Sequence, residues 1–221
     1  MLRSRKEEME TMKLNLASIT CVLLIFCYAV FGQEAKTVRR RQPTPILSTG
    51  TEGETPGAQT ASAMIANAVL EALDSTTSIN LRECISRNHI PPDEAHKLFL
   101  SVQLPAISQT QSVYFVRTDI DHPCRLIGAH AFRYWLVVKS KSLNSATYNV
   151  RYSGGSDGVS ILHSIHKGMY DIESDSYTGS SALMVTKQFN GSQYVDTICK
   201  KAHRTNRGKE VVKIIPCRPL E

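Results

Sequence analysis

A serine within a glycine-rich pentapeptide is the residue whose type and spacing best suit covalent chemistry. Residues 154–158 read Gly-Gly-Ser-Asp-Gly, which fits the GxSxG pattern that presents Ser156 as a nucleophile on a sharp turn between a strand and a helix. Asp171 and His203 follow in the chain order serine, acid, histidine, with Asp196 as a second acid. In such a triad the histidine takes the serine's proton and the acid orients the histidine. One hypothesis is therefore a secreted hydrolase that uses Ser156.

The segment after the pentapeptide argues against that chemistry. Residues 159–165 read Val-Ser-Ile-Leu-His-Ser-Ile, which predicts a strand, whereas the nucleophile turn needs a helix at this point. The alternating strands and helices of an α/β fold are also missing from the surrounding sequence. We therefore expect a glycine-rich chain reversal at 154–158, and we favour a protein that is not an enzyme.

Histidine and acidic residues also occur at spacings that resemble parts of metal sites. His163 and His166 are three residues apart, which suits one metal on a helix, but along a strand the two side chains point to opposite faces. Asp171, Glu173 and Asp175 alternate as an acidic ladder, yet the loop glycine of an EF-hand is absent. We predict neither a metal site nor a cofactor.

The only tryptophan lies in an aromatic apolar run, residues 132–138. Tyr134 and Trp135 could form an exposed platform for a carbohydrate or a peptide, because aromatic faces offer a large contact area. Packing in the core is the alternative that we favour. The formal net charge is +6, and basic residues gather near the C-terminus without interleaved aromatics. No nucleic-acid partner is expected from that pattern.

An apolar run near the start of the chain predicts where the protein goes. Residues 16–31 are apolar and follow Lys13, which is the pattern of a secretory signal peptide. We predict a signal over residues 1–32 with cleavage before Gln33, and translation that starts at Met12, because the acidic residues before Met12 suit a signal poorly. The mature protein would then be secreted or periplasmic.

The alternative is an uncleaved membrane anchor over the same residues 16–31. Arginines at 39–41 follow the apolar run, and positive charge normally stays on the cytoplasmic side. However, the run is shorter than the roughly 20 residues that cross a bilayer. We therefore favour cleavage, with no stable membrane span afterwards.

The cysteines fit an exported chain. Cleavage would leave four of them: Cys84, Cys124, Cys199 and Cys217. An even number outside the cytoplasm predicts two disulfides, and three pairings are open. We favour Cys84–Cys124 with Cys199–Cys217, because the second bond would tie down a basic C-terminal tail. The absence of a CxxC pair gives no support for a redox or zinc site.

The mature chain divides by composition into three parts. Residues 33–59 have no apolar period and predict a disordered spacer. Residues 60–75 carry apolar side chains at helical spacing and predict an amphipathic helix. Residues 76–217 predict a disulfide-containing, β-rich domain that opens with a short helix over 78–86 and ends in the basic tail.

Apolar side chains alternate in short runs through most of that domain. The predicted strands are 98–104, 113–118, 132–139, 147–152, 159–163, 169–173, 182–189 and 193–198. Asn190-Gly191 between two of them predicts a type I′ hairpin turn. We therefore expect a mainly β (α+β) fold, an antiparallel sheet or sandwich of about 6–8 short strands with one or two N-terminal helices.

Short motifs in the second half of the chain match a known pattern. They are Cys124, Gly128, Tyr134-Trp135, Gly158 with Ile161-Leu162, Gly168-Met169-Tyr170-Asp171-Ile172, and Phe189-Asn190-Gly191-Ser192-Gln193-Tyr194. Over residues 113–199 the chain resembles a group of small, mostly uncharacterised exported bacterial proteins. Met169 stands where that group has tyrosine, and Asn190 replaces its aspartate. The resemblance implies an exported β-sheet domain and no particular activity.

These observations favour an exported, non-catalytic protein that binds or inhibits a partner in the cell envelope or the extracellular space. The expected partner is a protein or a polysaccharide that meets an exposed sheet face. The rival hypothesis is the secreted hydrolase built on Ser156, Asp171 and His203.

Overall fold

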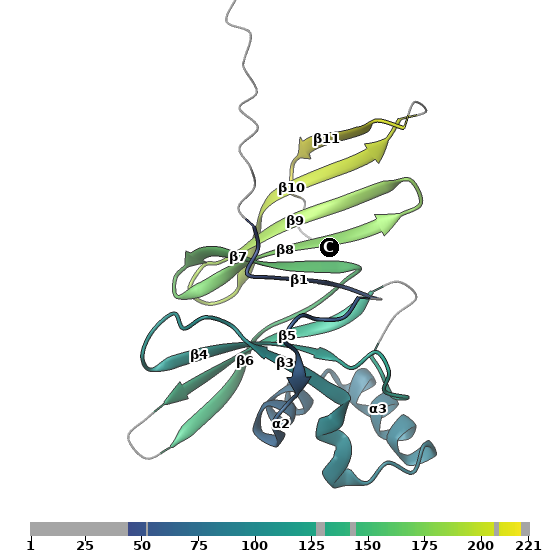
Figure 1. The fold of residues 1–221 in the computed structure, drawn as a ribbon, viewed down its shortest axis with the longest axis vertical. Helices are drawn as coiled ribbons and strands as arrows, with labels where there is room; N and C mark the ends of the chain where they lie inside the picture. The colour runs from purple at the N-terminus through teal and green to yellow at the C-terminus, as the bar shows by residue number, and fades with distance from the viewer. Residues whose placement is uncertain (1–43, 52, 127–130, 142–144, 206–207, 218–221) are drawn as a thin grey trace, which may run out of the picture. The chain divides into compact units, whose positions relative to one another are not determined.

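The computed structural model describes residues 44–51, 53–126, 131–141, 145–205 and 208–217. They form two antiparallel sheets and a helical layer (Figure 1). The fold is mainly β, as the sequence predicts. The predicted signal, the alternative anchor, and the first part of the predicted spacer lie outside the described residues.

The first sheet, sheet A, has six strands in the order β1-β7-β8-β9-β10-β11. They are β1 (Leu47–Gly50), β7 (Gly158–His166), β8 (Met169–Thr178), β9 (Ser181–Phe189), β10 (Tyr194–Arg204) and β11 (Glu210–Ile215). The second, sheet B, has five strands in the order β2-β3-β4-β5-β6. They are β2 (Gln59–Thr60), β3 (Phe99–Gln103), β4 (Gln111–Thr118), β5 (Phe132–Lys141) and β6 (Ala146–Ser156). Every predicted strand segment contains a strand, but the described residues form eleven strands and not the expected 6–8, because β1, β2 and β11 were not predicted.

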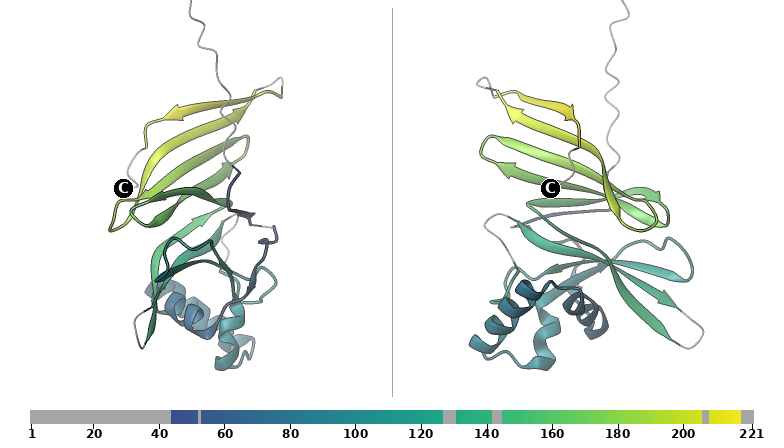
Figure 2. Two further views of the ribbon diagram at one scale, coloured as in Figure 1. Left: turned by 60° about the vertical axis from the view of Figure 1, so that its left-hand side comes forward. Right: turned by 180° about the vertical axis from the view of Figure 1, so that it is seen from behind.

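Alternate side chains of β5 enter two different cores, which explains why this strand is an almost continuous apolar run. One set packs between the two sheets: Phe132, Tyr134, Leu136 and Val138. The other set, Trp135 and Val137, packs under the helices. Figures 1 and 2 show the helices on the side of sheet B that faces away from sheet A. Both Tyr134 and Trp135 are fully buried, so the exposed aromatic platform is wrong and core packing is confirmed.

The helical layer consists of α2 (Ala63–Glu71), α3 (Ser75–Arg87) and a 3-10 helix, η1 (Pro92–Leu98). The helix predicted over 60–75 is shorter, because two N-cap residues set its limits. Ser62 accepts a hydrogen bond from the first turn of α2, and Asp74 does the same for α3. The second predicted helix is confirmed and is longer than expected.

The predicted disordered spacer, residues 33–59, is wrong for its second half, which contains β1 and the first residue of β2. Leu47 and Thr49 are buried, and β1 pairs along its length with β7. The connection between β1 and β2 is held by the buried Arg117 of β4. Its Nη1 donates to Gly50 O at 2.8 Å and to Thr49 Oγ1 at 2.9 Å, and its guanidinium lies 4.2 Å from the centre of the Phe132 ring. Composition alone missed this because the contacts are long-range.

The predicted basic tail is also wrong in part, because residues 210–215 form β11 at the edge of sheet A. Lys213 and Glu210 give this segment the composition of a solvated tail, although its other four residues are valines and isoleucines. The disulfides are Cys84–Cys124 and Cys199–Cys217, the favoured pairing. The first joins α3 to the loop after β4, and the second joins β10 to the segment after β11.

Two chain reversals differ from their predicted form. The hairpin at Asn190-Gly191 is present, but only Gly191 has a positive φ, so the turn is not type I′. Instead, Asn190 Oδ1 accepts hydrogen bonds from the next residues and closes a longer loop. The positive φ values of a type I′ turn occur at Lys167 and Gly168, between β7 and β8. The segment 154–158 is not a hairpin, because β6 and β7 lie in different sheets.

Candidate functional site

Ser156 is the last residue of β6 and is only 1% exposed. Its Oγ donates a 2.8 Å hydrogen bond to the carbonyl oxygen of Gly158. The chain then continues as strand β7 and not as a helix. The nucleophile turn is therefore absent at this serine. The Ser156 hydroxyl instead stabilises the connection between β6 of sheet B and β7 of sheet A.

Asp171 and His203 lie far apart within sheet A. His203 is opposite Ser181, and Ser181 is opposite Thr178, which lies seven positions along β8 from Asp171. At ~3.3 Å per residue this separation is on the order of 20 Å. Asp196, the second candidate acid, forms an ion pair with Lys187. The predicted triad is not assembled.

Asp171 has other partners, which together satisfy its buried carboxylate. The side chain is 2% exposed. Ser164 Oγ donates to it at 2.6 Å, Gln188 Nε2 donates at 3.3 Å, and His166 Nδ1 lies 2.7 Å away. These partners come from β7 and β9, on either side of β8. The arrangement therefore joins three strands, since a buried carboxylate needs such donors.

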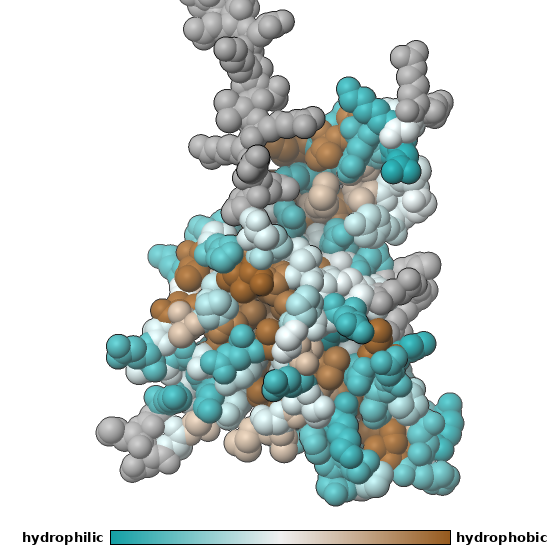
Figure 3. Space-filling model, in the orientation of Figure 1, coloured by the Kyte–Doolittle hydropathy of each residue, from teal (hydrophilic) through white to brown (hydrophobic). Residues whose placement is uncertain are grey.

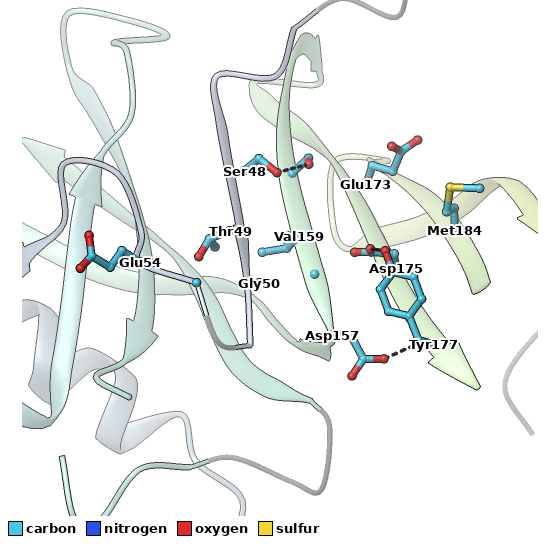
Figure 4. A pocket seen from close by; sticks show the side chains of 13 residues that line it. Ser48, Thr49, Gly50, Glu54, Asp157, Val159, Glu173, Asp175, Tyr177 and Met184 are labelled. Carbon is cyan, nitrogen blue, oxygen red and sulfur yellow. Dashed lines mark hydrogen bonds between the residues drawn. The ribbon is translucent and has the colours of Figure 1, made fainter. Parts of the chain in front are cut away.

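Two residues of the predicted ladder, Glu173 and Asp175, line a cavity of about 510 Å³ on one face of sheet A, the acidic pocket (Figure 4). Tyr177 lies across it: its hydroxyl donates to Asp175 at 2.6 Å and its backbone N–H donates to Asp157 at 2.6 Å. The hydrogen bond to Asp175 is the main reason that the pKa of Tyr177 rises to about 12. Glu173 pairs with Lys200 on the same face. Among the described residues, no histidine, cysteine or acidic side chains gather closely enough to hold a metal ion.

The opposite face of sheet A forms a larger hollow against β6, the intersheet groove, of about 830 Å³. Its lining includes Leu183 and Val185 of β9, Ser174 of β8, and Tyr152 of β6. Apolar side chains and glycine backbone thus make up much of the surface. The Lys187–Asp196 ion pair, with 2.5 Å between its atoms, adds a neutralised polar contact.

The tyrosine wall of the groove depends on a glycine. A Cβ on Gly154 would lie 2.7 Å from the Tyr152 ring and 2.8 Å from the Tyr134 ring, so both rings pack directly on this backbone. Tyr152 also packs on Tyr194 with 4.9 Å between the ring centres. Burial raises the pKa of Tyr152, which keeps its hydroxyl neutral. Tyr152, which lines the groove, is thus packed against Gly154 and Tyr194 and gives the tyrosine wall a mainly apolar surface.

The second disulfide shapes the end of the groove. Cys199 lines it on β10, and Ile215 and Pro216 line it just before Cys217. The bond holds these residues against β10 at the edge of sheet A, where β11 is the last strand. The disulfide that the sequence assigned to tail restraint thus also supports a cavity wall.

Two lysines continue the groove face along β10 and β11. Lys201 is opposite Leu183 on one side and opposite Lys213 on the other. Directly opposed residues of neighbouring strands point to the same face, so both lysines share the face of Leu183 and Val185. Both are exposed, and neither forms an ion pair with another described residue.

Sequence reasoning missed the groove entirely. Leu183 and Val185 appeared only as apolar positions of a strand, and Lys213 as part of a tail. Their alternation carried a usable signal, because Leu183, Val185 and Lys187 must share one face of a strand. Whether that face of β9 stays exposed depends on how much of sheet A is covered by sheet B. The alternation within one strand does not contain this information.

Comparison with family models, curated proteins and solved structures found no match for this chain. Within the part of the chain that the structure describes, no helix has the length and apolar character needed to cross a membrane. The two disulfides are consistent with an exported protein.

Proposed function

We propose that this protein is an exported, non-catalytic binding protein that holds its ligand in the intersheet groove. The observation that carries the proposal is the groove itself. Its volume of about 830 Å³ falls in the range of ligand sites, and its lining is apolar with a few polar groups. Ligand pockets in proteins have this composition, because apolar walls supply affinity and a few polar groups fix orientation.

Binding explains the groove better than catalysis does. Ser156 is buried and bonded to backbone, Asp171 is saturated by its own neighbours, and His203 is remote from Asp171. A hydrolytic reaction needs a nucleophile and its base within hydrogen-bond reach of each other. The hydrolase hypothesis is therefore not carried further.

Export supports the same proposal. The apolar run at 16–31 predicts a signal, and both disulfides suit an oxidising compartment. An exported β-rich domain is also what the resemblance to small exported bacterial proteins implies. The protein would act in the cell envelope or the extracellular space.

The test uses a neutral apolar fluorophore, N-phenyl-1-naphthylamine, and protein purified from an oxidising compartment. The variant is Leu183→Glu, which places a charge in the groove. The matched control is Ile198→Glu, because Ile198 is 42% exposed against 41% for Leu183 but belongs to the opposite face of sheet A. We expect saturable fluorescence enhancement with wild type and the control, and at least about tenfold weaker binding with Leu183→Glu.

Thermal unfolding of both variants checks that the fold is retained. The proposal fails if wild type gives no saturable enhancement. It also fails if Leu183→Glu binds the fluorophore as well as Ile198→Glu does, because the site would then lie elsewhere.

A further inference from the structure

Two exposed cations are placed directly opposite each other at the edge of the intersheet groove. Lys201 and Lys213 are register partners on β10 and β11. Like charges opposite each other on neighbouring strands oppose folding. The ion pairs among the described residues include neither lysine. An anion bound between the two ammonium groups would remove their repulsion.

An apolar row lies next to this pair on the same face. Leu183 is the β9 partner of Lys201, and two positions further along the strands come Val185, Cys199 and Ile215 in register. The following row holds Lys187 and Asp196, which neutralise each other. Moving inward along the strands, the face is thus cationic, then apolar, then neutral polar.

We infer that the ligand of the intersheet groove is a free long-chain fatty acid. Its carboxylate lies on Lys201 and Lys213, and its alkyl chain lies over Leu183, Val185 and Ile215 toward the tyrosine wall. This inference rests on the function proposed above, since it names the ligand class of the same groove.

Charge complementarity selects this occupant over others. Among the described residues of this face, unpaired charge lies at the end that Lys201 and Lys213 form, which matches an amphiphile with a single anionic head. The acidic pocket lies on the other face of sheet A, so its carboxylates do not compete for the two lysines. The groove volume suits one ligand of small-molecule size.

The experiment measures displacement of N-phenyl-1-naphthylamine at pH 8 by three amphiphiles of equal chain length. They are myristate, 1-tetradecanol and tetradecyltrimethylammonium, whose head groups are anionic, neutral and cationic. The variant is Lys201→Gln/Lys213→Gln. The control is Lys97→Gln/Lys141→Gln, which removes the same charge from exposed lysines of η1 and β5.

We expect myristate to displace the fluorophore best. In the Lys201→Gln/Lys213→Gln protein, myristate affinity should fall about tenfold and fluorophore affinity should not change, because only the head-group contacts are removed. The control should behave as wild type. Added salt should weaken myristate binding to wild type, but not below the affinity of the Lys201→Gln/Lys213→Gln protein.

The outcomes separate this inference from the proposed function. Absence of fluorophore binding overturns both. If the fluorophore binds normally, three results would overturn the fatty-acid inference alone. In the first two, myristate is not the best competitor, either because it fails to displace the fluorophore or because tetradecanol or the cationic amphiphile displaces it equally well. The third result is equal myristate binding by the two double variants.

Discussion

Arg117 is buried without a carboxylate within ion-pair distance among the described residues, and removing it should release the start of the fold. Its guanidinium donates to a set of neutral acceptors in and around the connection from β1 to β2: Thr49 Oγ1, Gly50 O, Thr51 O, Gly53 O and Thr55 Oγ1. Burial lowers the pKa of Arg117, although arginine remains protonated at physiological pH. Arg117→Met keeps much of the side-chain volume and removes every donor.

The magnitude follows from the two shortest contacts, 2.8 Å to Gly50 O and 2.9 Å to Thr49 Oγ1. Hydrogen bonds from a charged donor contribute about 1.5–3 kcal/mol each, so losing both would cost about 3–6 kcal/mol. Removing the buried charge recovers part of this, because desolvation of the guanidinium opposes folding. We expect the free energy of unfolding to fall by about 3 kcal/mol. Arg117→Lys should lose a similar amount, since an ammonium group cannot reproduce the planar fork.

Urea unfolding monitored by the fluorescence of Trp135, which is fully buried, measures the change. The matched control is Arg133→Met on β5, because Arg133 is exposed and forms a surface ion pair with Asp74. The control should unfold at the wild-type urea concentration. Hydrogen exchange should also accelerate at the amide of Ile46, which bonds to β7. The reasoning is refuted if Arg117→Met and Arg133→Met unfold at the same urea concentration.

Two further predictions concern the disulfides and the start of α3. Replacing Cys84 and Cys124 by serine should lower the free energy of unfolding by about 4 kcal/mol, and replacing Cys199 and Cys217 by about 3 kcal/mol, since the closed loops differ in length. Only the second pair should also weaken fluorophore binding, and equal binding by both double variants would contradict its part in the groove wall. Asp74 has its pKa lowered from 3.8 to about 2, chiefly by hydrogen bonds within the first turn of α3. A group whose pKa is lower in the folded state stabilises the protein fully above its unfolded pKa of 3.8 and loses this effect as the pH falls through the folded value of about 2. The stability difference between wild type and Asp74→Ala should therefore be nearly constant above about pH 5 and shrink steadily as the pH falls to 2 and below. A difference that is as large at pH 2 as at pH 5 would count against this cause.

Local patterns were sufficient where a segment's own residues decide its structure. The alternation through 132–139 predicted β5, and Asn190-Gly191 predicted a hairpin. The type of that turn depends on where the pairing of β9 with β10 ends, at Phe189 and Tyr194, and the local sequence does not determine this position. The type I′ turn at Lys167-Gly168 was missed because lysine rarely adopts a positive φ. Its conformation follows from the pairing of β7 with β8.

Long-range partners decided the remainder. β1 has only four residues, and its place in sheet A depends on β7 and on Arg117. The groove forms because Tyr152 of sheet B and Val185 of sheet A line the same hollow. The periodicity within a strand does not predict which sheet that strand joins. The candidate triad failed for the same reason, because chain order does not predict distance within a sheet.

The alternation of β5 between two cores has a consequence for how the protein melts. Tyr134 contributes to the packing between the sheets and its neighbour Trp135 to the packing beneath the helices, so one backbone serves both interiors. If either core loses its packing, β5 loses contacts on one face and becomes less stable. The other core, which packs on the opposite face of β5, is then destabilised as well. The described residues should therefore lose their structure in one all-or-none transition, with equal calorimetric and van't Hoff enthalpies.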